Sequence, residues 1–162
     1  MRPADEEARA VARGLLGGAA YAALAVSLPD TGAPFVSRIA LGMDEAGPLS
    51  LVSELAQHTG ALRKRPRCSL LVGEPGAKGD ALSHPRLTLQ CEAHFASREA
   101  AEFPQMRAGW LNSHPKSKLY IDFADFSFVR FRIREGFLNG GFGLACMLTP
   151  ADLAIEPGGA QA

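Results

Sequence analysis

The sequence predicts a mainly antiparallel β-barrel with flanking helices, and three observations lead to that fold class. Residues 86–95 alternate apolar side chains with polar ones, which is the period-two pattern of a half-buried strand. Several further apolar segments are separated by short turns such as Pro29-Asp30-Thr31-Gly32, and strands joined in this way pair antiparallel. The pattern gives six or seven strands, and a sheet of that size removes its exposed edges by closing into a full or partial barrel.

The elements follow one another along a chain of 162 residues, which we expect to form one domain over residues 1–162. A helix is expected within residues 1–17, because Asp5, Glu6 and Glu7 favour the positive end of a helix and Gly17-Gly18 ends it. Strands are expected at residues 21–28, 35–41, 49–53, 68–72, 86–95 and 126–134, with one or two more between residues 136 and 148. Two further helices are expected at residues 59–65 and 97–110, and residues 156–162 are expected to be a flexible tail.

Caps and breaks help to define the later elements. Thr59 is the candidate N-cap of the helix at residues 59–65. Ser97 is the candidate N-cap of the helix at residues 97–110, in which Pro104 predicts a kink or a break. The alternation of the strand at residues 126–134 shifts near Phe128-Val129, which predicts a β-bulge.

The composition excludes several classes of function. The 17 basic and 17 acidic residues balance, so net charge gives no reason to expect a nucleic-acid or membrane partner. Cys68, Cys91 and Cys146 form no CxxC pair, so we expect buried core residues rather than a zinc site or a disulfide framework. The mixed charges at the N-terminus differ from a signal peptide, and no apolar stretch is long enough to span a membrane. A cytoplasmic protein is therefore expected.

One constellation predicts an anion site. Arg38 lies in a predicted strand, and residues 53–60 lead from another strand end into the start of a helix. Free backbone N–H groups and the helix dipole favour an anion at such a point, and Ser53, His58 and Thr59 would add hydrogen bonds. Spacing alone leaves an ordinary alternative open, in which Thr59 only caps the helix and Arg38 is a solvated strand residue.

The other motifs give weaker indications of a binding or catalytic site. The basic run at residues 63–67 is typical of a solvated helix end, and residues 136–143 lack the GxGxxG spacing of a dinucleotide loop. The four histidines form no metal-binding motif, and no GxSxG nucleophile elbow exists. If the protein is an enzyme, its hard chemistry is expected to belong to a cofactor.

The order of three segments resembles a known superfamily. Residues 37–41, residues 49–59 and residues 67–72 together are similar to the pyridoxamine-phosphate-oxidase-like, FMN-binding split-barrel superfamily. Residues 84–89, residues 120–123 and residues 136–143 resemble its haem-utilisation (HugZ-type) branch. The resemblance covers residues 8–154.

The resemblance implies a six-stranded split barrel that forms a homodimer with its ligand site at the subunit interface. Carried over by position, it implies that the cofactor-binding residues are Arg38, Ser53, Gln57, His58, Thr59 and Arg86. The chain lacks the Arg-rich, Trp-containing C-terminal segment of true pyridoxamine-phosphate oxidases, which argues against vitamin B6 oxidation.

Three functions remain open from the sequence. The first hypothesis is an FMN-binding flavoprotein, an oxidoreductase that exchanges electrons with a small-molecule substrate. The second is a haem-binding or haem-degrading protein, for which His58, His84 or His94 would be the iron ligand. The third is a barrel without catalytic activity that binds a tetrapyrrole or a protein partner.

Overall fold

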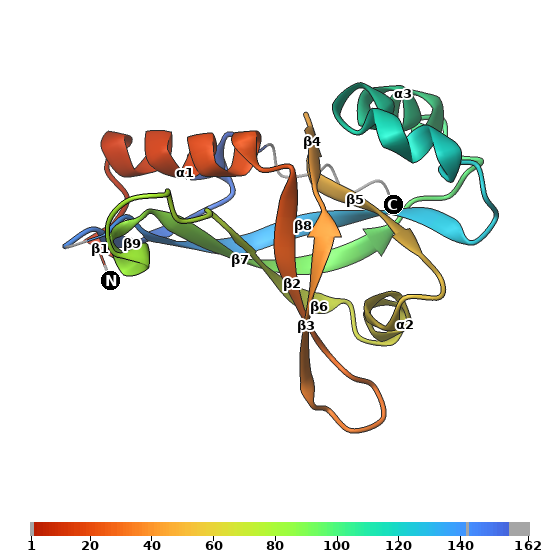
Figure 1. The fold of residues 1–162 in the computed structure, drawn as a ribbon, viewed down its shortest axis with the longest axis horizontal. Helices are drawn as coiled ribbons and strands as arrows, with labels where there is room; N and C mark the ends of the chain where they lie inside the picture. The colour runs from red at the N-terminus through yellow and green to blue at the C-terminus, as the bar shows by residue number, and fades with distance from the viewer. Residues whose placement is uncertain (1, 142, 156–162) are drawn as a thin grey trace.

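The computed structural model describes residues 2–141 and 143–155, so the predicted tail at residues 156–162 lies outside the described residues. Nine strands of the described chain join into one sheet (Figure 1). The strands are β1 (Arg2–Pro3), β2 (Tyr21–Ser27), β3 (Pro34–Ala40), β4 (Gly42–Asp44), β5 (Gly47–Ser53), β6 (Arg67–Val72), β7 (Arg86–Phe95), β8 (Phe126–Asn139) and β9 (Ala145–Leu148). The helices are α1 (Glu6–Gly18), α2 (Gln57–Lys64) and α3 (Phe103–Ser113), with 3-10 turns η1 (Ala81–Ser83), η2 (Pro115–Leu119) and η3 (Ala151–Leu153).

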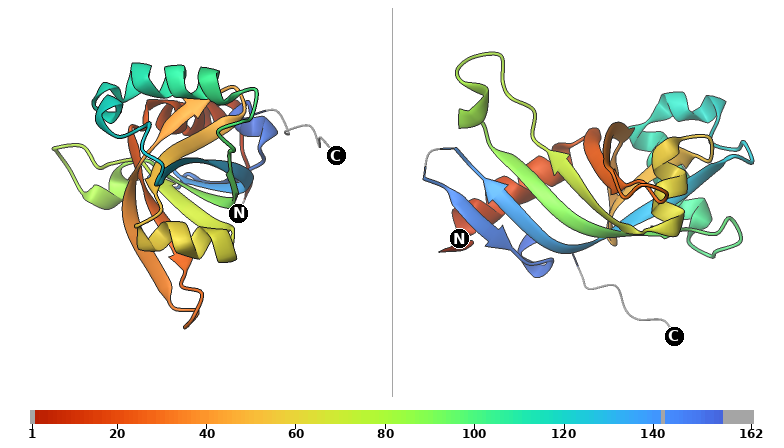
Figure 2. Two further views of the ribbon diagram at one scale, coloured as in Figure 1. Left: turned by 90° about the vertical axis from the view of Figure 1, so that its right-hand side faces the viewer. Right: turned by 90° about the horizontal axis from the view of Figure 1, so that it is seen from below.

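The sheet is antiparallel and curled, which confirms the predicted split-barrel class. Its strand order is β1-β9-β8-β7-β6-β2-β3, with β4 and β5 branching from the first part of β8. Every pairing is antiparallel except the short parallel contact of β1 with β9. The left view of Figure 2 shows the sheet curling round, with α3 and α2 on opposite sides. The nine strands exceed the six that the resemblance implied; β9 lies where a last strand was expected, whereas β1 and β4 are short strands that the sequence did not predict.

Two apolar cores hold the curl in place. Inside it, Ala8, Ala12 and Leu16 of α1 pack against inward-facing residues of β2, β6, β7 and β8. Outside it, Met106 and Trp110 of α3 pack on a second cluster that includes residues of β5 and β8. β5 is therefore buried on both faces, which explains its nearly continuous apolar sequence.

The β-bulge lies elsewhere on β8 than predicted. Gln90 pairs with Glu135 and Cys91 pairs with Ile133, so Arg134 is the extra residue. The bulge is not what interrupts the alternation of apolar and polar residues at Phe128-Val129. Both residues are buried because Phe128 faces the α3 cluster and Val129 faces the barrel core.

Two of the predicted helix starts were wrong. α1 begins within the expected range, after Asp5, whose side chain accepts a hydrogen bond from the Ala8 N–H at 2.9 Å. α2 begins after Ala56, so Thr59 is not its cap. α3 begins at Phe103, so Pro104 lies in the first turn, where proline is well tolerated, and causes no kink. Across the described chain, no helix combines the length and the apolar character needed to cross a membrane.

The three cysteines are buried core residues with free thiols, as predicted. Burial raises the pKa of the Cys68 thiol to about 12, so almost none of it is ionised at neutral pH. The thiol therefore behaves as a small apolar side chain.

Hydrogen bonds from two arginine side chains hold α1 against η3. The Arg9 Nε lies 2.7 Å from Asp152 Oδ1, and the Arg13 Nε donates to the Asp152 backbone carbonyl at 2.8 Å. The Thr149 backbone N–H and hydroxyl also donate to the Asp152 carboxylate, and these bonds together with the bond from Arg9 lower the pKa of that carboxyl to about 2. The ionised form of Asp152 is therefore favoured by folding.

We expect Asp152→Asn to remove part of the acid dependence of stability. A pKa lowered in the folded state stabilises the protein above the unfolded pKa of about 3.9, and this contribution disappears as the pH falls towards 2. Urea unfolding should show the variant less stable at pH 6, with a difference that shrinks between pH 4 and pH 2. Glu7→Gln, on the exposed side of α1, is the control, and equal pH profiles for Asp152→Asn and the wild type would contradict this account.

Candidate functional site

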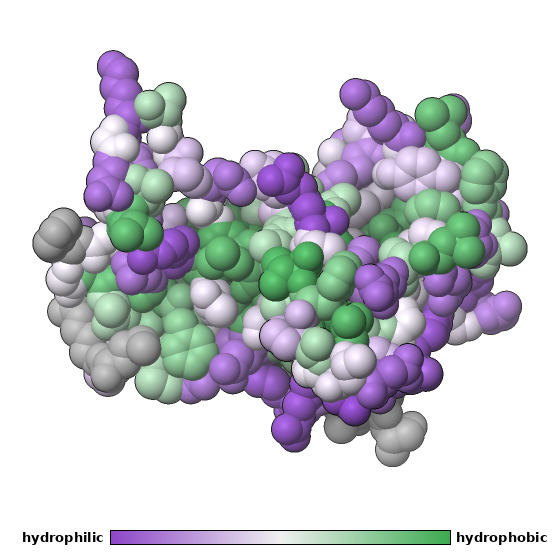
Figure 3. Space-filling model, turned by 60° about the horizontal axis from the view of Figure 1, so that its bottom comes forward, coloured by the Kyte–Doolittle hydropathy of each residue, from purple (hydrophilic) through white to green (hydrophobic). Residues whose placement is uncertain are grey.

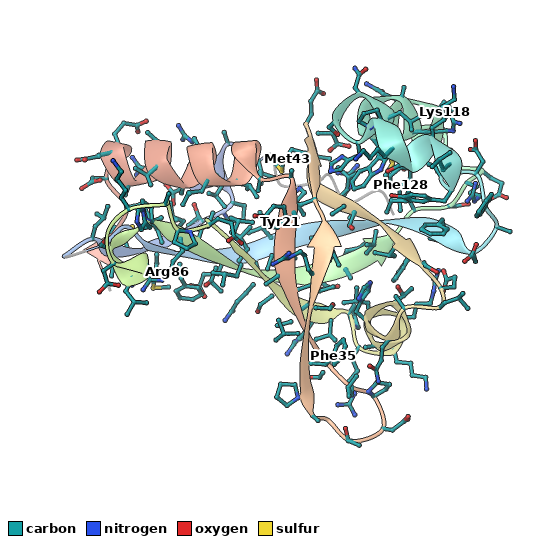
Figure 4. All side chains as sticks on the ribbon, in the orientation of Figure 1. Tyr21, Phe35, Met43, Arg86, Lys118 and Phe128 are labelled. Carbon is teal, nitrogen blue, oxygen red and sulfur yellow. The ribbon has the colours of Figure 1, made fainter. Side chains whose placement is uncertain are left out.

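The candidate site is a groove of about 430 Å³ between the end of α1 and the outer face of the sheet. We call it the Arg38 groove. Figure 4 shows Tyr21 at the start of β2, below the end of α1. The lining residues are Gly14, Leu15, Gly18, Ala19, Ala20, Tyr21, Ala23, Arg38, Leu71, Val72, Gly73 and Glu74. Most of the wall is apolar or lacks a side chain, and Arg38 supplies a positive charge.

Arg38 points outward because side chains alternate along β3. Ile39 beside it faces the core, so Arg38 faces the groove, where its guanidinium carbon lies 5.2 Å from the centre of the Tyr21 ring. No carboxylate of the described residues forms an ion pair with Arg38. Its charge is therefore available to an anionic ligand.

A row of outward-facing residues crosses six strands from Arg38. In register order it comprises Arg38, Ala23, Leu71, Thr88, Phe137 and Met147. Leu71 is 44% exposed and Met147 39%, and Val36 beside this row is 64% exposed. Figure 3 shows hydrophobic residues across the middle of this side of the molecule. This row is therefore mainly apolar, with Thr88 as a polar member, and it ends at a cation.

Arg86 occupies the same outer face at the start of β7. It lies beside Gly73, since a Cβ atom added to Gly73 would meet the Arg86 Cα at 2.8 Å and the Pro85 carbonyl oxygen at 2.5 Å. The φ angle of Gly73 is +105°, which also requires glycine. Arg86 itself donates to the carbonyls of Leu82 and His84. The structure thus places two of the predicted residues, Arg38 and Arg86, on the same face of the sheet, but only Arg38 lines the groove.

Glycines open the α1 side of the groove. Gly14 and Gly18 are one turn apart, both line the groove, and a Cβ atom at either would meet nothing within 4 Å. Glycine inside a helix costs about 1 kcal/mol relative to alanine, and the described chain contains no contact that requires it here. The helix therefore presents bare backbone to the groove, which suits close approach of a flat ligand.

The other four predicted residues lie apart from this groove, at the start of α2. Ser53 Oγ accepts from the Leu55 N–H and donates to Asp125, and Gln57 is exposed. His58 Nδ1 lies 2.9 Å from Ser37 Oγ, and burial lowers the pKa of the His58 ring. Because Ser37 precedes Arg38 on β3, it points to the opposite face, so these residues and Arg38 do not converge within one subunit.

Thr59 differs from the other predicted residues because it is fully buried. Its Oγ1 has no hydrogen-bond partner among the described residues. Buried hydroxyls nearly always find a partner, so this atom marks the start of α2 as a place where polar contacts are incomplete.

The remaining candidate histidines are held by local contacts. His84 Nε2 lies 2.8 Å from the Lys78 carbonyl in the loop beside Arg86. His94 is 43% exposed and lies 3.5 Å from Glu92. It stands eight residues from Arg86 along β7, which places it about 27 Å away.

A second cavity, of about 470 Å³, lies between β4 and α3. Trp110 forms part of its wall, and the Arg130 guanidinium there forms two hydrogen bonds with the Asp44 carboxylate, at 2.6 and 2.7 Å. Its cation is therefore already paired, and none of the predicted site residues lies in it.

The sequence did not identify Tyr21, Leu71 or the glycines of α1 as parts of a site. A signal was present for the glycines, because three glycines near the end of an amphipathic helix oppose helix formation. Tyr21 and Leu71 gave no signal, because which face of a strand is outward depends on the curl of the whole sheet.

Comparison with known proteins finds relatives in sequence and in structure. No family model matches the sequence. The chloroplastic non-canonical haem oxygenase HOZ of Arabidopsis thaliana is 36% identical over 100 residues, which is 61% of this chain and 29% of that protein. The heme binding protein from Mycobacterium smegmatis is 30% identical with a TM-score of 0.82, over 95% of this chain and 61% of that one.

A further solved structure is 44% identical with a TM-score of 0.83, over 94% of this chain and 98% of its own. Two structures of low identity show the same fold. Campylobacter jejuni ChuZ is 18% identical with a TM-score of 0.81, over 93% of this chain and 63% of its own. A pyridoxinephosphate-oxidase-family protein of Clostridium acetobutylicum is 12% identical with a TM-score of 0.69, over 93% of this chain and 99% of its own. The chain therefore has the split-barrel fold of these two structures.

This split barrel has a heme binding protein and the heme storage protein HutZ of Vibrio cholerae among its structural neighbours, in agreement with the resemblance to the haem-utilisation branch. It spans 29% of the Arabidopsis relative and 61% of the mycobacterial one. The activities of those whole proteins therefore do not transfer to it directly.

The split barrel depends on Gly73 to place Arg86. We expect Gly73→Ala to destabilise the fold by about 1–3 kcal/mol, because the added methyl group meets backbone atoms and the φ angle is positive. Gly60→Ala in α2 is the matched control, since its Cβ would meet nothing within 4 Å and it should stabilise the helix by about 0.5–1 kcal/mol. Urea unfolding followed by circular dichroism measures both, and similar effects of the two changes would contradict the steric account.

Proposed function

We propose that this split barrel binds haem in the Arg38 groove. The observation that carries the proposal is the groove itself, where a bare helix backbone and apolar side chains of the sheet meet Arg38. Haem is a flat, largely apolar macrocycle with two carboxylates on one edge. The apolar surface matches the macrocycle, and guanidinium groups match the carboxylates.

The relatives favour haem over flavin as the ligand. Two relatives with 30% identity or more carry haem in their names. Bound haem would supply an iron centre for oxygen or electron chemistry. We propose haem binding rather than haem breakdown, because this chain corresponds to 29% of the Arabidopsis haem oxygenase.

A homodimer is part of the proposal. The row from Arg38 to Met147 leaves apolar side chains on the outer face, and a second copy would cover them. The groove opens onto that face, so a partner subunit would close over the ligand. The resemblance to dimeric split barrels supports the same arrangement.

FMN is the second candidate ligand, and the start of α2 favours it. The unpartnered Thr59 Oγ1 lies in the first turn of that helix, where backbone N–H groups favour a phosphate. Two features oppose it in a single subunit. The Asp125 carboxylate accepts from Ser53, and Arg38 points to the other face of β3.

Parallel titrations with haemin and FMN, followed by visible absorption, test the ligand. We expect a saturable haem spectrum, and Arg38→Ala should weaken haem binding by about 2 kcal/mol, or about 30-fold in Kd, because one charge-assisted contact is lost. Arg107→Ala on α3 is the control, since that arginine pairs with Asp122 away from the groove. Saturable flavin binding without a haem spectrum would replace haem by FMN, and no response to either ligand would refute both.

Sedimentation velocity at micromolar concentration tests the dimer. The wild type should sediment at twice the subunit mass, and Leu71→Glu should dissociate it, because a carboxylate would be buried in an apolar interface. Leu119→Glu is the control, because Leu119 is 79% exposed on η2 and outside the outer row. A monomeric wild type would show that the interface does not form.

A further inference from the structure

Tyr21 is the one side chain of the Arg38 groove with an oxygen suited to bind ferric iron as a phenolate. It begins β2, lines the groove and is 41% exposed. Its hydroxyl forms no hydrogen bond within the described residues. Glu74 also lines the groove, but carboxylates are not among the usual protein ligands of haem iron, whereas tyrosine is.

The three candidate histidines fit the groove less well than Tyr21. His58 is half-buried beside Ser37, on the opposite face of β3 from Arg38. His94 stands near the far end of β7 from Arg86. His84 is close in sequence to Arg86, but its ring packs towards Gly76, whose added Cβ would meet the His84 Cε1 at 3.0 Å.

Arg38 places a positive charge beside the Tyr21 ring. The guanidinium carbon lies 5.2 Å from the ring centre, so a fixed positive charge faces the ring that becomes negative when the phenolate binds iron. Because no carboxylate of the described residues pairs with Arg38, this charge is not already compensated within the described chain.

We infer that Tyr21 is the protein ligand of ferric haem in the Arg38 groove, with Arg38 as its charge partner. This rests on the proposed haem binding and adds the ligand atom, Tyr21 Oη. As the Fe–O bond forms, the phenol releases its proton to water and the iron remains ferric.

The test uses the full chain loaded with haemin and compares three variants. Tyr21→Phe should weaken ferric haem binding about tenfold or more and abolish the phenolate-to-iron charge-transfer band, measured by absorption and resonance Raman spectroscopy. Tyr120→Phe is the matched control, since Tyr120 is the only other tyrosine and its hydroxyl bonds Ser117 near α3. His84→Ala tests the nearest histidine.

The outcomes separate this inference from the proposed function. Loss of the phenolate band in Tyr21→Phe alone supports Tyr21 as the ligand. A bound haem whose spectrum is unchanged in Tyr21→Phe overturns the inference and leaves haem binding intact. If His84→Ala alone changes the spectrum, the histidine is the ligand and the inference is wrong. Absence of haem binding in the wild type refutes the proposed function itself.

Discussion

β8 pairs with β7 along the whole length of β7, while its other edge is divided between β5 and β9. The first residues of β8 continue the barrel through β5, and the last residues leave it to pair with β9. The barrel is therefore split, and α1 fills the opening with Ala8, Ala12 and Leu16. The Arg38 groove lies where the end of this helix meets the sheet, so the divided edge of β8 determines where the groove can form.

The sequence predicted the strands well, because period-two alternation reports directly on a sheet with one buried face. β7 was predicted with its observed ends, since residues 86–95 alternate without interruption. Helix starts were harder to predict. Thr59 and Ser97 are good capping residues by type, but tertiary packing buries Thr59 and places Ser97 in a turn before α3. Local propensity was overridden by packing at both positions.

The candidate site was predicted only in part. The resemblance grouped six residues, and the structure divides them between the outer face of the sheet and the start of α2. The division follows from a single step along β3, where Ser37 and Arg38 face opposite ways. A single sequence cannot show which alternate positions along a strand face outward, because that depends on which face of the sheet α1 covers. In the proposed homodimer, the second subunit would change how near these two groups of residues lie to one another.

The two halves of α1 are held with unequal strength. Arg9 and Arg13 anchor the first half to η3, whereas Gly14, Gly17 and Gly18 weaken the second half and leave its surface bare. Backbone amides near residues 15–18 should therefore exchange their hydrogens with solvent faster than those near Ala12, through local opening rather than global unfolding. Any molecule that settles on the bare backbone would slow that exchange, so the helix end would report occupancy of the groove even for a ligand without colour.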